Sequence, residues 1–307
     1  MLTHDTFPRR HLVAAMVAVA SLGAAAASQE RFPRPEDAMH ALVDAARAHD
    51  QAKLVAVLGP GSEDVVSSGD PVDDRAAAAR FVAAATVRTR FETLDDGHVV
   101  VHLGKEDWPF PVPLERSADG WQFDTVAGRD ELLNRRIGRN ELAAIESCRA
   151  YVEAQRQYAS RARDGAAGSY AQKIVSDAGT RDGLYWDEAD GRDPSPLGPL
   201  FAAASLEGYT LRNARADPQP YHGYFYRVLT AQGPHTPGGA RSYVREGRMT
   251  DGFALVAYSA ERGSSGIMTF VVGSAGIVFQ KDLGEGTAEA AKTMAAYDPD
   301  ESWSPVR

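Results

Sequence analysis

Three arginines, Arg135, Arg136 and Arg139, stand within five residues in a chain whose formal net charge is -9. Guanidinium groups form paired hydrogen bonds with carboxylates and phosphates, and free N–H groups at a helix start also favour anions. The cluster comes directly before a helical pattern that we expect to begin near Asn140. Positive charge at a helix start costs about 0.3 to 1 kcal/mol per residue, so we expect compensating partners. Acidic residues nearby in the sequence are Asp124, Asp130, Glu131 and Glu141.

The arginine cluster allows three interpretations. The favoured one is structural: bidentate pairs with the neighbouring carboxylates would fasten two folding units together, with the joint at 129–139. The second is a bound anion, and the third is a set of solvated side chains. Arg135, Arg136 and Arg139 are therefore a predicted joint and also candidate ligand-binding residues.

An aromatic and proline-rich segment, DWPFPVPL, covers residues 107–114. Proline has no N–H group to donate within a central strand, so this segment is expected to be an edge strand or a covering segment. An exposed surface containing Trp108 and Phe110 would offer a platform for a ligand or partner. The alternative is that both rings pack across the edge of a sheet.

The segment YHGYFYR, residues 221–227, gathers a histidine among aromatic side chains. Strand alternation places Tyr224 on one face and Arg227 on the other. Tyr221 and His222 come directly before this strand, and a histidine there is a candidate ligand contact or acid–base group. The alternative is a hydrogen-bonded or exposed histidine in a turn.

Recognised catalytic and metal-binding patterns are missing from the sequence. His98 and His102 are four residues apart in an expected strand, and no clustered Cys/His pattern accompanies them. Ser264 and Ser265 occur in ERGSSGIM, which lacks the Gly-x-Ser-x-Gly spacing of a nucleophile and is interpreted as a hairpin turn. No glycine-rich phosphate loop is present either. We therefore predict no catalytic residues, no metal ligands and no cofactor.

Composition narrows the class of protein. The 307 residues are 44% hydrophobic and 24% charged, which is typical of globular proteins, and the length suggests two domains. The acidic balance argues against nucleic acid as a partner, because such binding needs clustered basic residues. Cys148 is the single cysteine, and its place on the apolar face of the expected helix predicts a buried, unreactive thiol.

Residues 1–27 have the pattern of a secretory signal peptide: Arg9 and Arg10, an apolar run, and an Ala-x-Ala motif ending at Ala27. The apolar run is shorter than the roughly 20 residues that span a bilayer, and an uncleaved anchor is the alternative. The paired arginines weakly resemble a twin-arginine signal, although the general secretory route is slightly favoured. We expect a periplasmic or secreted protein without a stable membrane anchor after cleavage.

The rest of the chain is predicted to form two α+β domains, 28–128 and 140–307, on either side of the joint. The first is expected to have a helix from Pro35, a second helix capped by Asp73 or Asp74, and an antiparallel sheet. The second is expected to pack one long helix on an antiparallel sheet. The predicted elements after the first helix are helix 73–87, strands 98–103, 107–116 and 120–126, helix 140–163, helix 201–206, strands 223–229, 252–258, 266–272 and 276–282, and a helix at 287–297 capped by Thr287.

Several segments together resemble an exported bacterial family catalogued as domain of unknown function 2950. They are SSGDPVDDR (67–75), DWPFPVPL (107–114), LLNRRIGRNELAAIESCRAYVEAQRQYA (132–159), PYHGYFYRVLTAQG (220–233) and MTFVVGSAGIVFQKDLG (268–284). This resemblance covers nearly all of the chain after the signal peptide. It implies an exported protein and supplies no catalytic residues. By looser analogy of fold, the first domain resembles an NTF2-like cone and the second resembles the globular head of a pilin.

The favoured hypothesis is a non-enzymatic envelope protein that binds a small molecule or another envelope protein where its two domains meet. One alternative is an envelope hydrolase with an unfamiliar site that uses His222 with Asp187 or Glu188. A second alternative is a pilin-like component of a structural assembly.

Overall fold

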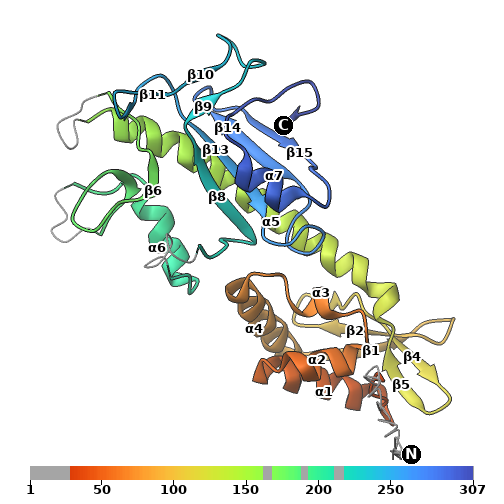
Figure 1. Ribbon diagram of the computed structural model, residues 1–307. Helices are drawn as coiled ribbons and strands as arrows, with labels where there is room; N and C mark the ends of the chain where they lie inside the picture. The colour runs from red at the N-terminus through yellow and green to blue at the C-terminus, as the bar shows by residue number, and fades with distance from the viewer. Residues whose placement is uncertain (1–27, 162–167, 188–192, 211–217, 307) are drawn as a thin grey trace, which may run out of the picture.

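The computed structural model describes residues 28–161, 168–187, 193–210 and 218–306, and this part of the chain has a mixed α+β fold. The predicted signal peptide, 1–27, and Glu188 lie outside the described residues. Figure 1 shows the N-terminal elements gathered at one end of the molecule and the C-terminal elements at the other, with helix α5 running between them. The fold class predicted from the sequence is confirmed at this level.

In the part of the chain that the structure describes, four helices precede the first sheet. They are α1 (Pro35–Ala48), α2 (Gln51–Leu58), α3 (Glu63–Val66) and α4 (Pro71–Val87). Proline in the first turn and acidic residues behind it favour the start of α1, as expected. The predicted cap of α4 is wrong: Asp70 is the N-cap, and its Oδ1 accepts hydrogen bonds from the backbone N–H groups of Val72 and Asp73 at 3.1 and 3.2 Å.

An antiparallel sheet follows these helices. Its strands are β1 (Thr89–Thr93), β2 (Val99–Leu103), β3 (Trp108–Pro109), β4 (Leu114–Ser117) and β5 (Gly120–Phe123). The order is β1-β2-β4-β5, and β3 also pairs with β2. The single strand predicted at 107–116 is interrupted, because prolines at 111 and 113 cannot donate to a continuous ladder. Strand β1 was not among the predicted elements.

Helix α5 (Thr125–Ala159) is continuous through the segment 129–139. The predicted helix start near Asn140 is therefore wrong, and the predicted joint lies inside a helix. The Asp124 side chain caps the helix by accepting from the backbone N–H of Ala127 at 3.0 Å. The arginine cluster thus lies well inside the helix, so the argument from charge at a helix start does not apply to it.

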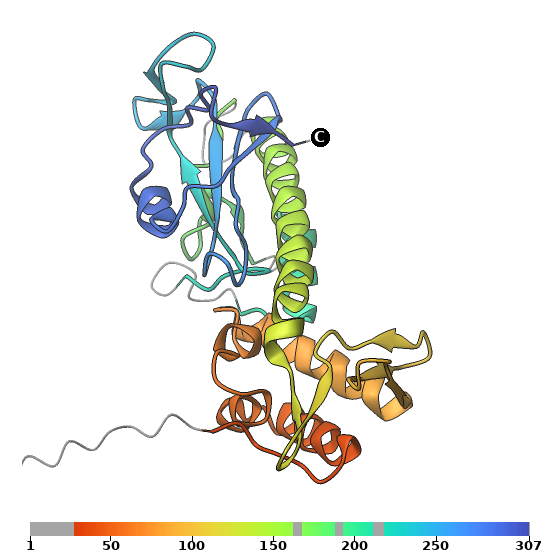
Figure 2. The same ribbon diagram turned by 90° about the vertical axis from the view of Figure 1, so that its right-hand side faces the viewer.

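The second sheet is antiparallel and lies between two helices. Its order is β16-β15-β14-β13-β8, with strands β8 (Tyr224–Leu229), β13 (Ala254–Ser259), β14 (Thr269–Gly273), β15 (Val278–Lys281) and β16 (Ser304–Pro305). Figure 2 shows α5 on one face of this sheet and the short blue helix α7 (Thr287–Thr293) on the other. Four of these strands match predicted ones. The predicted cap of α7 is wrong, because Gly286 is the N-cap and Thr287 Oγ1 donates to the Gly284 carbonyl oxygen at 2.6 Å.

The remaining elements are short. They are β6 (Lys173–Val175), β7 (Gly183–Tyr185), α6 (Gly198–Leu206), β9 (Ala231–Gln232), β10 (Arg241–Ser242), β11 (Val244–Arg245) and β12 (Arg248–Met249). Strands β6 and β7 pair in parallel, and α6 covers the predicted helix at 201–206. Within the described chain, no helix combines the length and the apolar character needed to cross a membrane.

Buried hydrophobic side chains form two clusters. The N-terminal cluster contains Met39, Val101 and Phe123, and the C-terminal cluster contains Cys148 and Phe270 among many others. Cys148 is fully buried, and burial raises the pKa of its thiol to about 12. The prediction of a buried thiol is confirmed.

Helix α3 and the loop between α3 and α4 fasten the two regions together through polar contacts. Asp70 is fully buried, and its Oδ2 accepts hydrogen bonds from the Tyr209 hydroxyl and the Gly223 N–H, both at 2.9 Å. Ser264 Oγ donates to the Asp64 carbonyl oxygen at 3.1 Å. Ser264 lies between the antiparallel strands β13 and β14, so the interpretation of ERGSSGIM as a hairpin turn is confirmed.

Candidate functional site

A groove of about 710 Å³ lies between α4 and the first half of α5. We call it the arginine groove, because Arg135, Arg136 and Arg139 line it together. Trp108 and Phe110 also line it, so the structure brings together two sets of candidate residues that the sequence places apart.

The small side chains of α4 explain why this space is open. Ala77, Ala78 and Ala84 line the groove, and α4 has no buried side chain along its 17 residues. A methyl group reaches only a short distance from the helix, so α4 cannot fill the space beneath α5. The other apolar contributors include Leu42, Leu54, Leu58, Val65, Val66, Phe81, Leu103 and Leu132.

Arg136 is the structural member of the cluster. Its guanidinium donates from Nη1 to the Asp64 carbonyl oxygen at 2.6 Å and to Ser264 Oγ at 3.3 Å, and from Nη2 to the Val65 carbonyl oxygen. Burial lowers the pKa of this guanidinium, and the nearby Asp74 opposes that effect. The predicted carboxylate partners are wrong for Arg136, because it binds the backbone carbonyls that end α3.

Arg135 and Arg139 are exposed and lie one helical turn apart. Arg135 Nε donates to Glu131 at 2.6 Å, a predicted carboxylate partner, and its guanidinium lies 5.5 Å from the centre of the Trp108 ring. Arg139 donates to the Arg135 carbonyl oxygen at 3.2 Å and, among the described residues, pairs with no carboxylate. Like charges one turn apart repel mildly, so a bound anion would relieve this pair.

Positive charge predominates around the groove in an otherwise acidic chain. The cationic lining side chains are Arg80, Lys105, Arg135, Arg136 and Arg139, against the acidic Asp74 and Glu106. Asp74 is held by the Ser68 N–H at 3.1 Å, and burial raises the pKa of its carboxyl group. An apolar floor with a cationic rim suits a molecule that has an apolar body and an anionic end.

The two aromatic candidates, Trp108 and Phe110, differ in how deeply they are buried. Phe110 is buried and touches both Phe81 and Phe123, with ring centres 5.4 and 6.2 Å apart. Trp108 is only partly buried and lies at the edge beside Arg135. The alternative that the segment packs across a sheet edge therefore describes Phe110, whereas Trp108 is available to a ligand.

The candidates of the segment 221–227 lie elsewhere. Tyr221 and Arg227 line a second cavity of about 460 Å³ beside β8, with Tyr151, Phe201 and Tyr258. Tyr224 is fully buried, and its hydroxyl donates to the Met268 carbonyl oxygen at 2.9 Å, which makes it a core residue. Arg227 Nη2 donates to the Ala291 carbonyl oxygen at 2.6 Å on the α7 side of the sheet.

His222 pairs with a carboxylate that the sequence did not suggest. Its Nε2 lies 3.1 Å from Glu207, and its backbone N–H donates to the Tyr209 hydroxyl at 3.2 Å. Asp187, one of the acidic residues of the hydrolase alternative, instead accepts from the Tyr185 hydroxyl at 3.2 Å. His222 lies in a turn with a positive φ of 49°, and both partners come from the end of α6 and the residues after it, so the hydrogen-bonded interpretation describes it.

Sequence reasoning missed two features of this region. One is the alanine-rich wall of α4, which looked like an ordinary helix because alanine favours helices anywhere. The other is Asp70, although an aspartate directly before Pro71 is the expected pattern of a helix cap followed by proline in the first turn.

Comparison with known protein families gives a match. No curated protein and no solved structure matches the chain. The sequence profile of one family matches residues 29–306, which include every residue of the arginine groove. The resemblance noted from the sequence is therefore confirmed, and the chain belongs to the family described as "Protein of unknown function (DUF2950)".

Proposed function

We propose that this protein is a non-enzymatic binding protein for an anionic amphiphile, held in the arginine groove. One observation carries the proposal: exposed arginines and Trp108 meet above an apolar groove that the alanines of α4 leave open. The volume of about 710 Å³ falls within the roughly 300 to 1,000 Å³ typical of ligand sites.

The anionic end of the ligand is placed against Arg135 and Arg139. Both side chains are exposed, so neither has to leave a buried partner to bind a carboxylate or phosphate. Arg136 is assigned a positioning role instead, because its donors are engaged by backbone carbonyls at the end of α3. The apolar body then lies along Ala78, Ala84 and Phe81.

Export is part of this proposal. The pattern of residues 1–27 supports a secretory signal peptide, and a periplasmic or secreted location follows from it. We also propose that the helices and sheet of residues 28–128 are an NTF2-like unit and that the later helix and sheet resemble a pilin head. The arrangement of helices against antiparallel sheets supports both analogies, which bear on fold alone.

Calorimetric titration with three probes of equal chain length tests the function: laurate, dodecanol and dodecyltrimethylammonium. We expect laurate to bind most tightly. Replacing both Arg135 and Arg139 with glutamine should weaken laurate about tenfold to a hundredfold, since a hydrogen bond to a charged group is worth about 1.5 to 3 kcal/mol. The affinity for dodecanol should change little in that variant. Equal affinity of the wild-type protein for laurate and dodecanol would contradict the proposal.

Matched variants locate the site. Arg149→Gln removes an exposed arginine of the same helix that pairs with Glu146 outside the groove, and it should leave laurate binding intact. Ala78→Leu should block the groove, whereas Ala79→Leu adds the same side chain at an exposed position of α4 that does not line it. Equal effects of the two leucine variants would place the ligand elsewhere.

A further inference from the structure

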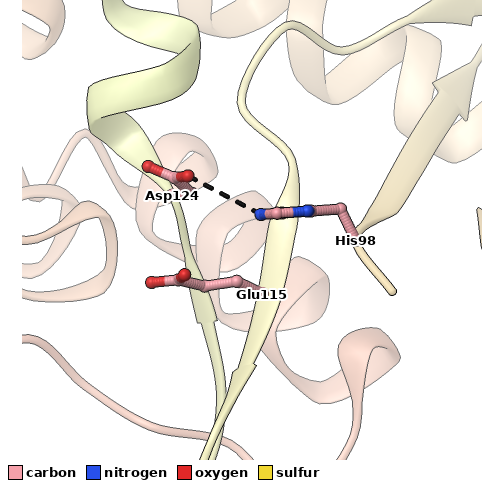
Figure 3. Close-up of side chains that lie close together, drawn as sticks. All are labelled: His98, Glu115 and Asp124. Atoms are coloured by element: carbon pink, nitrogen blue, oxygen red, sulfur yellow. Dashed lines mark ion pairs between the residues drawn. The ribbon is translucent and has the colours of Figure 1, made fainter. Parts of the chain in front are cut away.

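Three side chains with metal-binding chemistry meet at one end of the first sheet. His98 directly precedes β2, Glu115 lies in β4, and Asp124 caps α5. One ligand atom from each lies within 4.8 Å of the others, and all three residues are partly buried. Figure 3 shows the His98 ring and the Asp124 carboxylate pointing toward one another, with the Glu115 carboxylate beside them.

Strand pairing explains how these residues meet. Val99 of β2 is opposite Leu114 of β4, and the next position along this register places His98 beside Glu115. Glu115 is in turn opposite Gln122 of β5. Asp124 follows Gln122 by two residues, which directs it to the same face of the strand.

Each of the three side chains has a further contact that holds it in place, and for His98 and Asp124 this contact uses an atom other than the one that faces the partner. His98 Nδ1 lies 3.2 Å from Asp96 Oδ1, Asp124 Oδ1 accepts from the Ala127 N–H at 3.0 Å, and Glu115 Oε1 accepts from Gln122 Nε2 at 2.6 Å. A carboxylate on one imidazole nitrogen leaves the other free as a ligand, as in the outer shells of metal sites.

Charge and distance both leave room for a cation. Neither Glu115 nor Asp124 forms an ion pair with a lysine or arginine of the described chain, so two neighbouring carboxylates face each other without one. His98 Nε2 and Asp124 Oδ2 are 3.8 Å apart, too far for a hydrogen bond. Two ligands at about 2.1 Å from a tetrahedral ion are roughly 3.4 Å apart, so a small closure would suffice.

We propose that His98, Glu115 and Asp124 bind a divalent transition-metal ion of the zinc type. One imidazole nitrogen with two carboxylate oxygens suits such an ion better than calcium, which takes six to eight oxygen ligands. Three protein ligands leave a position for water or another ligand. The ion would also tie the first sheet to the start of α5, the helix that carries the arginine groove.

Calorimetry on the tag-free chain, after treatment with a chelator, tests the site with Zn²⁺, Mg²⁺ and Ca²⁺ as separate probes. We expect one zinc ion to bind, with Mg²⁺ and Ca²⁺ much weaker. Glu115→Gln and His98→Gln should each weaken zinc binding by more than about tenfold, the loss typical of outer-shell changes and a lower limit for a ligand. Unchanged binding in both variants would overturn the proposal.

Two other histidines provide matched controls. His102 pairs with Glu92 at 3.0 Å and His235 with Asp298 at 2.8 Å, so each is a histidine beside a carboxylate outside the proposed site. His102→Gln and His235→Gln should bind zinc as the unchanged chain does, and a loss in either would assign the ion to that pair instead. Cobalt absorption of the unchanged chain needs no variant: the weak spectrum of fully hydrated cobalt would contradict the proposal, and intense visible bands of low-coordinate cobalt would support it.

Discussion

Helix α5 contacts both regions of the molecule, but its second half packs against the second sheet whereas its first half borders an open groove. In the C-terminal cluster, Cys148 and Val152 of α5 share the core with the fully buried Phe270 of the second sheet, and the second cavity of about 460 Å³ borders this cluster beside β8. In the N-terminal region, the first half of α5 faces the alanines of α4 across the arginine groove. Side-chain size on the facing element decides the difference, because methyl groups cannot close a space that aromatic rings fill.

This contrast suggests that different parts of the chain stabilise the fold and bind a ligand. The packed half of α5 and its sheet lose apolar contact whenever a large side chain is removed, whereas the half beside the groove already lacks those contacts. Exposed arginines can lie beside an apolar groove because their charged ends stay in water while their stems cover apolar surface. The open region is thus the place where a ligand can add contacts that the protein alone does not make.

Removing one aromatic ring from each cluster gives the largest expected effect. Phe270→Ala should lower the free energy of unfolding by about 3 to 5 kcal/mol, because a cavity remains in a filled core. Phe81→Ala, at the partly buried edge of the groove, should cost about 1 kcal/mol, near the average for point mutants. Urea denaturation of both variants measures the difference. Equal losses would mean that the groove region is packed as tightly as the other cluster.

Removing the buried carboxylate of Asp70, which lies between the two regions, should give the second-largest loss of stability. Asp70→Ala leaves the Tyr209 hydroxyl and the Gly223 N–H without their acceptor, and hydrogen bonds to a charged group are worth about 1.5 to 3 kcal/mol each. We expect a loss of about 3 kcal/mol, since such contributions do not add fully.

Asp50→Ala is the matched control for Asp70. Asp50 also caps a helix, but it is exposed, and its side chain accepts from the Lys53 N–H within its own helix. Its loss should cost about 1 kcal/mol, the usual value of a cap. If thermal denaturation gave the same loss for both aspartates, the contact between the regions would contribute nothing beyond capping.

Two glycines of α5 test how closely the helix approaches the first sheet. A Cβ at Gly128 would collide with the Pro111 carbonyl and lie 2.5 Å from Val112 Cα, so Gly128→Ala should destabilise by about 1 to 3 kcal/mol. At Gly138 nothing lies within 4 Å of an added Cβ, and alanine should stabilise the helix by about 0.5 to 1 kcal/mol. A lower melting temperature for Gly128→Ala and a higher one for Gly138→Ala would establish that this end of α5 is rigidly packed against the first sheet. Changes in the same direction would refute it.

Elements with a local pattern were predictable from the sequence. Apolar segments bounded by turn residues identified β2, β8 and β13, because burial of one face or both is recorded in neighbouring residues. The start of α5 was missed because the polar segment 129–139 lacks an apolar face of the usual width, although Asp124 before Thr125 is a cap signal.

The candidate sites were less predictable because tertiary contacts make them. Arg135 and Trp108 were recognised separately by residue type, but their meeting depends on how β3 lies beside α5. His98, Glu115 and Asp124 come from three segments, and no spacing rule for metal ligands joins them. Alanines that leave a groove open are indistinguishable in sequence from alanines that simply favour a helix.

Removing an exposed ion pair of the C-terminal region should give the smallest effect. Arg262 donates to Asp282 at 2.8 and 2.6 Å, and the Gly284 N–H adds a third hydrogen bond to this carboxylate. The Arg262 hydrogen bonds are the main reason that the pKa of Asp282 falls to about 2. A lowered folded-state pKa stabilises the protein above the ordinary carboxyl value, and this contribution disappears as the pH falls through about 2.

Asp282→Asn should therefore cost less than about 1 kcal/mol at neutral pH, because solvent screens a pair whose side chains are 32% and 37% exposed. The difference in the free energy of unfolding between the unchanged chain and the variant should shrink as the solution is acidified toward the folded-state pKa. The Arg262→Gln variant should show the same dependence on pH. Urea denaturation across acidic pH measures both. A loss as large as that of Asp70→Ala would mean that charge pairing, rather than burial of the charged group, decides how strongly a carboxylate holds this fold together.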